Sequence, residues 1–493
     1  MTKSKALTIV LLMFVISILV RLPNLNRPVS KHHEFMSALI LINVESWQQA
    51  GGGSRFHYTP LLNYQNAGDK SPHTLWTDAK GNLWYLSMGP AWYIIPYFVY
   101  TLLHLPIEPI YLRILNLFFN FLSVVLLFFF VEQVVPMQIE KNKRYNIVLL
   151  SCFLFSFAPG MLWYLGNGYA HTGIMMPVVI VFLMIVLPIF SSPDKISTKR
   201  LTGLAITEII LVYFDWMGVV IALATILFLL FRIRNKKRYL WPVVILSVSA
   251  ILATALIFYQ YVSYCGVQGV TDYWKGHFYM RSFANTFQPI YFKAGWLIIH
   301  LITMYLPLII LIIFSAFGSL IQKKKIIFSN EEFFFIKIYV CCLLLYNYLF
   351  LEWSYEHEFS VVPWSLLLVY VGAKMVIHLF SKRAIFFILT VFFIVSVTQY
   401  YFINRPGKIS QDGMPFDTFK IFGEQLKQVP NNYMIISPLE KRAPMIEYYA
   451  KRNIFIIPTL EEAKKFLIEN NIHQAVWVDQ QNYQLKKITY LDR

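Results

Sequence analysis

The sequence predicts an all-α polytopic membrane protein with a small α/β domain near its C-terminal end. Of its 493 residues, 57% are hydrophobic and only 14% are charged, and the mean hydropathy is +0.54. Blocks of apolar residues alternate with short basic clusters, and many blocks are long enough to cross a hydrocarbon layer of about 30 Å. This composition excludes a water-soluble globular protein of this size.

The net charge of +17 does not indicate nucleic-acid binding. Many Lys and Arg residues lie in short loops between apolar blocks, as the rule that cytoplasmic loops of membrane proteins are positive requires. The four cysteines form neither a disulfide framework nor a CxxC metal motif. We therefore expect contact with membrane lipids and none with nucleic acid.

Eleven apolar blocks predict membrane-spanning helices in the plasma membrane. With the basic loops on the cytoplasmic side, the N-terminus is cytoplasmic and the C-terminal residues are extracytoplasmic. The first block lacks a small-residue cleavage site, so we expect a retained helix rather than a signal peptide. The blocks are residues 6–21, 110–132, 146–164, 173–190, 201–214, 217–231, 239–262, 292–320, 334–351, 360–377 and 384–402.

The apolar stretch 88–103 is expected to lie in the membrane interface instead. Counting it as a span would place every later basic cluster outside the cell. Its aromatic side chains, among them Trp92, favour the level of the lipid headgroups. We therefore expect interfacial helices within a long outer loop of residues 22–109, followed by outer loops at 263–291 and 352–359.

Residues 404–493 predict a small extracytoplasmic α/β domain, separate from a membrane domain of residues 1–403. Charged residues return there, and the pattern is typical of a βαβαβ unit, with a capping box of Thr459 and Glu462 on its last helix. It lacks a glycine-rich phosphate loop, so nucleotide binding is not indicated. The expected strands are residues 433–437, 453–458 and 474–478, and the expected helices are residues 415–429, 440–451 and 460–470.

The most informative segment, residues 31–35 (KHHEF), follows the first span. An apolar run with helical spacing continues to Trp47 and stops at three glycines from Gly51, which predicts an amphipathic helix on the membrane surface. That geometry would hold His33 and Glu34 just above the headgroups, where either group could accept a proton from a hydroxyl. The alternative is that both are polar interfacial residues that order a loop.

Here the sequence resembles a known family. The chain has a first span, then an acidic motif that opens a long outer loop, then the segment 81–90 (GNLWYLSMGP), and then Arg113 at the start of the second span. This arrangement is similar to that of the C-type (GT-C) glycosyltransferases. Within these, the likeness is greatest to protein O-mannosyltransferases and lipid A aminoarabinose transferases. It covers the membrane portion in architecture, and the sequence match lies mainly in residues 21–116. The resemblance implies inverting transfer of a hexosyl or pentosyl sugar from a polyprenyl-phosphate donor to an extracytoplasmic lipid, glycan or protein. It implies no cofactor, and a divalent cation is not favoured.

Two departures from the family pattern concern the site. Family members have an Asp-Glu pair where this chain has His33 and Glu34, which leaves the general base open between a carboxylate and an imidazole. Relatives have a basic residue before two prolines where this chain has SMGP at residues 87–90, so other cations must hold the donor phosphate. The candidate phosphate-binding residues are Arg113, Lys275, His277 and Arg281.

Further candidates lie in residues 352–358 (EWSYEHE). This segment gathers carboxylates, an imidazole and aromatic rings, and its candidate substrate-binding residues are Tyr355 and His357. Adjacent Glu and His side chains point apart on a helix, so a metal site is not favoured. Asp215, at the outer end of a span, is a third candidate for binding substrate, and Glu208 lies within the same span.

Alternatives to these interpretations remain open. Arg113 could anchor a helix end at the interface, and Lys275 and Arg281 could be solvated loop charges. Glu208 and the number of spans would suit a transporter or flippase of a lipid-linked or anionic substrate, although such carriers place ionisable residues near the midplane rather than on one face. A polymer ligase or polymerase is disfavoured because its usual large late loop is absent.

Overall fold

The computed structural model of the chain describes residues 1–29, 33–71, 77–233, 236–403, 415–439 and 443–491. Its contacts divide the chain into two compact units. The helical unit comprises residues 1–22, 114–256 and 277–402, and the mixed unit comprises residues 23–113, 257–276 and 403–493. The mixed unit thus joins the outer loop to the C-terminal region, which the sequence-based boundary after residue 403 treats as separate domains.

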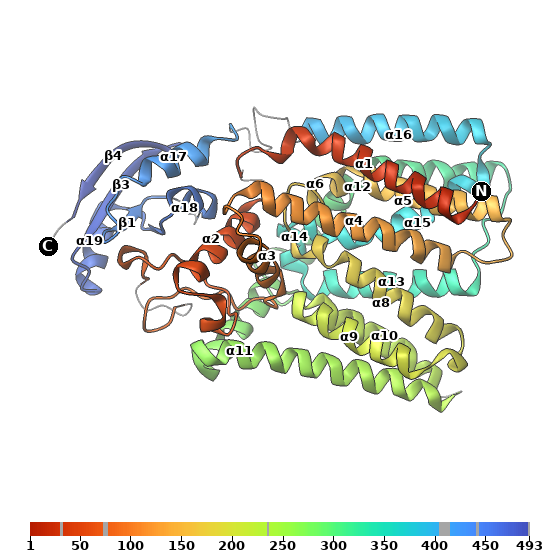
Figure 1. Ribbon diagram of the computed structural model, residues 1–493, viewed down its shortest axis with the longest axis horizontal. Helices are drawn as coiled ribbons and strands as arrows, with labels where there is room; N and C mark the ends of the chain where they lie inside the picture. Colours follow the sequence, from red (N-terminus) through yellow and green to blue (C-terminus); the bar gives the residue numbers. More distant parts are fainter. Residues whose placement is uncertain (30–32, 72–76, 234–235, 404–414, 440–442, 492–493) are drawn as a thin grey trace. The chain divides into compact units, whose positions relative to one another are not determined.

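The helical unit is a bundle of apolar helices (Figure 1). Each predicted span coincides with a helix or a pair of helices, and 6 helices of the described chain are long and apolar enough to cross a membrane. The chain is therefore a membrane protein. Helices lying wholly or mainly in this unit are α1 (Lys3–Leu25), α4 (Pro109–Val134), α5 (Lys141–Phe157), α6 (Pro159–Tyr164), α7 (His171–Ile174), α8 (Met176–Ser191), α9 (Thr198–Phe214), α10 (Met217–Ile233), α11 (Leu240–Arg281), α12 (Ile290–Ile321), α13 (Asn330–Leu349), α14 (Leu351–Glu356), α15 (Ser365–Leu379) and α16 (Lys382–Ile403).

The expectation of an outer loop at 263–291 is wrong for most of its length. Helix α11 continues to its end at Arg281, with one non-helical residue at Gly266, where φ is 67° and ψ is 165°. The indole N–H of Trp274 donates to the Leu86 carbonyl at 2.8 Å, so tertiary contacts outweigh the weak helix propensity of this glycine-containing segment. The expected loop at 352–359 is also largely helical.

Helix α2 (Phe35–Gln49) is present as expected, and its contacts are mainly with protein. Most of its side chains are buried, and it packs against α3 (Ala91–Leu102) and α18 (Pro444–Ala450) inside the mixed unit. It ends just before Gly51 and Gly52, whose φ values of 86° and 121° are positive. Glycine adopts such values at a lower conformational energy than other residues do. Helix α3 has 12 residues, a length of roughly 18 Å, and is too short to cross the bilayer.

The C-terminal region holds a sheet whose strands include β1, β3 and β4 in Figure 1. The sheet has four strands, β1 (Met434–Ser437), β2 (Ile454–Ile456), β3 (Ala475–Gln481) and β4 (Gln484–Tyr490), in the order β2-β1-β3-β4. The expected parallel βαβαβ unit is confirmed, and β4, which pairs antiparallel to β3, was missed. The Thr459 hydroxyl accepts from the Glu462 N–H at 3.2 Å, as its expected capping role requires. The remaining elements are α17 (Thr418–Leu426) and α19 (Leu460–Glu469). The start of the predicted helix 440–451 lies outside the described residues.

A buried ion pair fastens this region to the outer loop within the mixed unit. The Arg452 Nε atom lies 3.1 Å from both carboxylate oxygens of Asp69, and the Asn453 N–H donates to Oδ1 at 2.6 Å. The Arg452 Nη1 atom also donates to the carbonyls of Val429 and Pro430, each at 3.0 Å. Both charged side chains are almost fully buried, so each depends on the other for its stability.

Replacing Arg452 with alanine should therefore destabilise the protein by roughly 3–5 kcal/mol, because the Asp69 charge would stay buried without its partner. Thermal unfolding of the purified protein in detergent measures this loss. Lys465→Ala is the matched control, since Lys465 forms an exposed ion pair of 3.7 Å with Glu469 and should change stability by less than about 1 kcal/mol. Equal unfolding temperatures for the two variants would contradict the assignment.

Candidate functional site

The polar centre of the mixed unit is the carboxylate of Glu34. This side chain has no exposed surface, and each of its oxygens meets a different guanidinium. Oε2 lies 2.9 Å from Nη1 of Arg27, and Oε1 lies 3.0 Å from Nη2 of Arg113. Two buried guanidiniums of the described chain thus meet one buried carboxylate.

Arg113 also holds the chain that leaves the first helix. Its Nη1 atom donates to the carbonyls of Leu25 at 2.7 Å and of Arg27 at 2.6 Å. These bonds satisfy backbone oxygens at and just beyond the end of α1, which have no partner within the helix. Arg27 is fixed from another direction, since its guanidinium carbon lies 4.3 Å from the ring centroid of Phe416.

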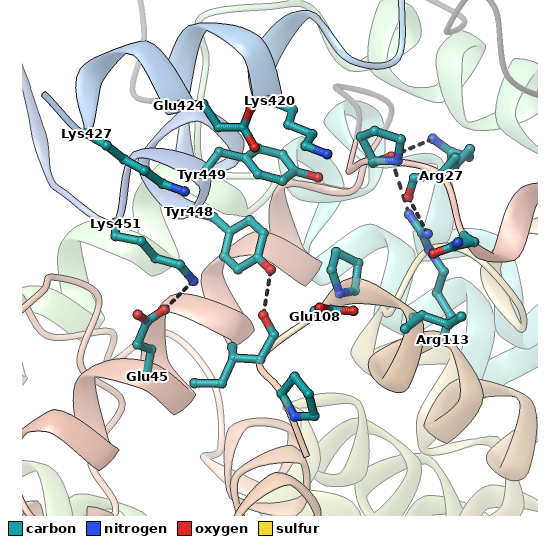
Figure 2. Close-up of a pocket in the computed structure, with 16 residues that line it drawn as sticks. Arg27, Glu45, Glu108, Arg113, Lys420, Glu424, Lys427, Tyr448, Tyr449 and Lys451 are labelled. Atoms are coloured by element: carbon teal, nitrogen blue, oxygen red, sulfur yellow. Dashed lines mark hydrogen bonds and ion pairs between the residues drawn. The ribbon is translucent and has the colours of Figure 1, made fainter.

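Both arginines line a pocket of about 700 Å³ in the mixed unit, shown in Figure 2. This volume is typical of small-molecule sites. Lys420 and Glu424 lie one turn apart on α17, and Lys427 directly follows its end. Lys451 Nζ pairs with Glu45 Oε2 at 2.6 Å. The charged and aromatic lining residues are Arg27, Glu45, Glu108, Arg113, Lys420, Glu424, Lys427, Tyr448, Tyr449 and Lys451.

His33 precedes Glu34 directly and has a φ of 51°, a left-handed conformation that is uncommon for a residue other than glycine. Backbone strain of this kind is often found at functional sites. The two residues before it in the predicted motif, Lys31 and His32, lie outside the described residues.

No family model matches the chain, and no curated protein matches it. Solved structures do match. A crystal structure of ArnT from Cupriavidus metallidurans bound to undecaprenyl phosphate has a TM-score of 0.58 at 10% identity, covering 96% of this chain and 92% of that chain. A second structure of the same protein in the apo state has a TM-score of 0.44 at 9% identity, with coverages of 97% and 93%.

The chain shares its fold with the ArnT bound to undecaprenyl phosphate. The architectural likeness expected for the membrane portion therefore extends over nearly the whole chain. At 10% identity it concerns the arrangement of the backbone, so the roles of side chains must be argued from this chain's own geometry.

The fold distributes the predicted site residues over both units. Of those in the mixed unit, His33 adjoins Glu34 in the chain, and Glu34 and Arg113 are in direct contact. Lys275 is exposed on α11 and makes no hydrogen bond or ion pair with any described residue. The predicted residues in the helical unit are Asp215, His277, Arg281, Tyr355 and His357.

The Asp215 side chain contacts other residues of the helical unit. Its Oδ2 atom lies 2.8 Å from Nε2 of His171, while Oδ1 accepts from the Met217 N–H at 2.6 Å and from the Tyr346 hydroxyl at 3.2 Å. The bond from Met217 satisfies a backbone N–H in the first turn of α10. Asp215 thus links α7, α10 and α13. The sequence alone does not indicate His171, because one histidine between two apolar blocks gives no spacing signal.

The other predicted residues of the helical unit lie near the ends of its helices. His277 and Arg281 are one turn apart on α11, close enough to interact electrostatically. The Tyr355 carbonyl accepts from Nε2 of His300 at 2.7 Å, and the His357 ring stacks on Phe359 with centroids 5.0 Å apart. Lys293, which sequence reasoning missed, is fully buried and pairs with Glu352.

Burial raises the pKa of Glu358 from its ordinary value of 4.5 to about 7. The folded protein therefore binds this proton more tightly than the unfolded chain does, and the free energy of unfolding should fall as pH rises from about 4.5 to about 7. Glu358→Gln should remove that fall, so the variant should be more stable than the wild type at pH 8 and similar to it near pH 4.5. Thermal unfolding at the two pH values measures the difference. Parallel pH profiles for wild type and variant would contradict it.

Proposed function

We propose that the chain is an integral-membrane inverting glycosyltransferase that moves a sugar from a polyprenyl-phosphate donor to an acceptor on the extracytoplasmic side. The observation that carries this proposal is the pair of buried guanidiniums, Arg27 and Arg113, at a pocket of about 700 Å³. The shared fold supports it, since the matching ArnT structure holds undecaprenyl phosphate.

The orientation follows from charge. Short basic loops favour the cytoplasmic face, so the N-terminus is cytoplasmic and the segment between the first two spans is extracytoplasmic. Glu34 and the pocket belong to this side together with the C-terminal region. The donor would then present its phosphate and sugar at the outer leaflet while its polyprenyl chain stays among the lipids.

The transfer is a single displacement. An acceptor oxygen attacks the anomeric carbon while the bond from that carbon to the phosphate oxygen breaks, and the configuration inverts. The departing polyprenyl phosphate takes the bonding electrons and gains negative charge. Arg27 and Arg113 lower the barrier because two pre-positioned guanidiniums stabilise that charge better than water does.

Glu34 is better suited to positioning these arginines than to accepting a proton. Both of its oxygens are in contact with guanidiniums, so an acceptor hydroxyl would have to displace one of them to reach the carboxylate. We therefore assign the acceptor proton to the imidazole of His33, whose ordinary pKa is about 6.5. In this assignment Glu34 keeps the two cations at a fixed separation.

A transporter remains the second candidate because of Glu208. This carboxyl is fully buried on α9, and neither of its oxygens has a hydrogen-bond partner among the described residues. Buried ionisable groups in membrane helices are often functional. A carrier would bind a lipid-linked sugar and move it without cleaving it, which separates the two candidates experimentally.

Glu34→Gln and Arg113→Ala should each lower sugar transfer by roughly a hundredfold or more, since each disrupts the cationic cluster that stabilises the departing phosphate. The assay uses purified protein, a panel of radiolabelled polyprenyl-phosphate sugars and crude cell-envelope acceptor. Lys465→Ala, on the exposed face of α19, is the control and should retain wild-type transfer.

Wild-type rates in both site variants would remove the proposed site. If the wild-type protein binds the donor lipids but consumes none of them, the transporter becomes the better interpretation. Loss of transfer in His33→Ala, combined with retention in Glu34→Gln, would leave His33 as the base and deny Glu34 its positioning role.

A further inference from the structure

Two neighbouring tyrosines of α18 line the pocket and use their hydroxyl groups in opposite ways (Figure 2). The Tyr448 hydroxyl donates to the Ile107 carbonyl at 2.6 Å, so its proton is already committed to the backbone. The Tyr449 hydroxyl instead accepts from the Val29 N–H at 2.9 Å. Its own proton therefore remains available to a ligand.

The surroundings of Tyr449 favour an anionic partner for that proton. No described residue accepts a hydrogen bond from this hydroxyl, and Figure 2 shows it directed toward the side of the pocket that holds Arg27 and Arg113. The charges of Arg113, Glu34 and Arg27 all act on the phenol. Burial raises the pKa of Tyr449 to about 12, so the group stays protonated at every physiological pH and remains a hydrogen-bond donor.

The bond from Val29 also fixes where this donor lies. Val29 is in the short segment that follows α1, and Arg113 holds the same segment through the carbonyls of Leu25 and Arg27. The phenol and the guanidinium are thus attached to one stretch of backbone. A phosphate that binds at Arg113 would therefore meet two groups whose positions are already fixed. Little conformational entropy would be lost on binding.

We propose that Tyr449 is a binding residue for the donor phosphate, and that its hydroxyl donates a hydrogen bond to a phosphate oxygen beside Arg27 and Arg113. This inference rests on the proposed function. It gives the C-terminal region a direct part in the site, because Tyr449 lies on α18. A neutral hydrogen-bond donor also adds directionality to a site whose two cations alone would attract other anions.

The test compares Tyr449→Phe with Tyr448→Phe in the full-length protein reconstituted in lipid nanodiscs. Each variant removes one hydroxyl from the same helix and the same pocket, and only Tyr449 offers its proton to a ligand. The probes are undecaprenyl phosphate and undecaprenol, which differ only in the phosphate. Equilibrium binding is measured for both lipids, and thermal unfolding checks that the variants stay folded.

Tyr449→Phe should weaken binding of undecaprenyl phosphate by roughly tenfold or more and leave binding of undecaprenol unchanged, as loss of one hydrogen bond to a charged group requires. Tyr448→Phe should leave both affinities unchanged. Unchanged phosphate affinity in Tyr449→Phe would overturn the proposal, as would equal losses in both variants or for both lipids, which would indicate a change in the fold.

The proposed function can fail separately in the same experiment. If the wild-type protein does not prefer undecaprenyl phosphate over undecaprenol, the donor site itself is wrong, and the role of Tyr449 falls with it. If the wild type shows the preference and only the Tyr449→Phe result is negative, the donor site stands and this inference alone is overturned.

Discussion

The paired carboxylate of Glu34 is the constraint on which the site depends. A charge with no exposed surface is stable only beside opposite charge, and here that charge comes from Arg27 and Arg113. Arg113 uses its remaining donors on the chain that follows α1, so one buried cluster sets the end of the first helix and the start of α4. Without Glu34 the two guanidiniums would repel each other, and their positions at the pocket would change.

The sequence predicts this site only in part. Glu34 and Arg113 stand out singly, because each is an ionisable residue at the edge of an apolar block, but they are separated by 79 residues and only the fold brings them together. Arg27 was missed since an arginine beside a proline in a short loop is indistinguishable from an ordinary loop charge. Tyr449 was missed because the significance of a hydroxyl depends on which of its two hydrogen-bonding roles the backbone has already used.

The same distinction between local pattern and tertiary contact explains the successes and errors in the fold. Long apolar blocks predict helices well, because few other structures can bury them in a membrane. An apolar face alone does not reveal whether lipid or protein covers it, so the sequence predicts helix α2 but not its packing against α3 and α18. The strand β4 was missed because the turn before it, Asn482-Tyr483, contains no glycine, the residue that usually marks a turn of this kind in a sequence. Its two residues nevertheless take positive φ values of 52° and 61°.

The central claim is that the guanidiniums held by Glu34 form the phosphate site of a polyprenyl-phosphate donor. The most direct test is an experimental structure of the full-length protein with undecaprenyl phosphate. The account predicts phosphate within hydrogen-bond distance of Arg27 or Arg113, in the pocket that α17 and α18 line. A phosphate bound instead at Lys275, His277 or Arg281, with this pocket empty, would contradict it.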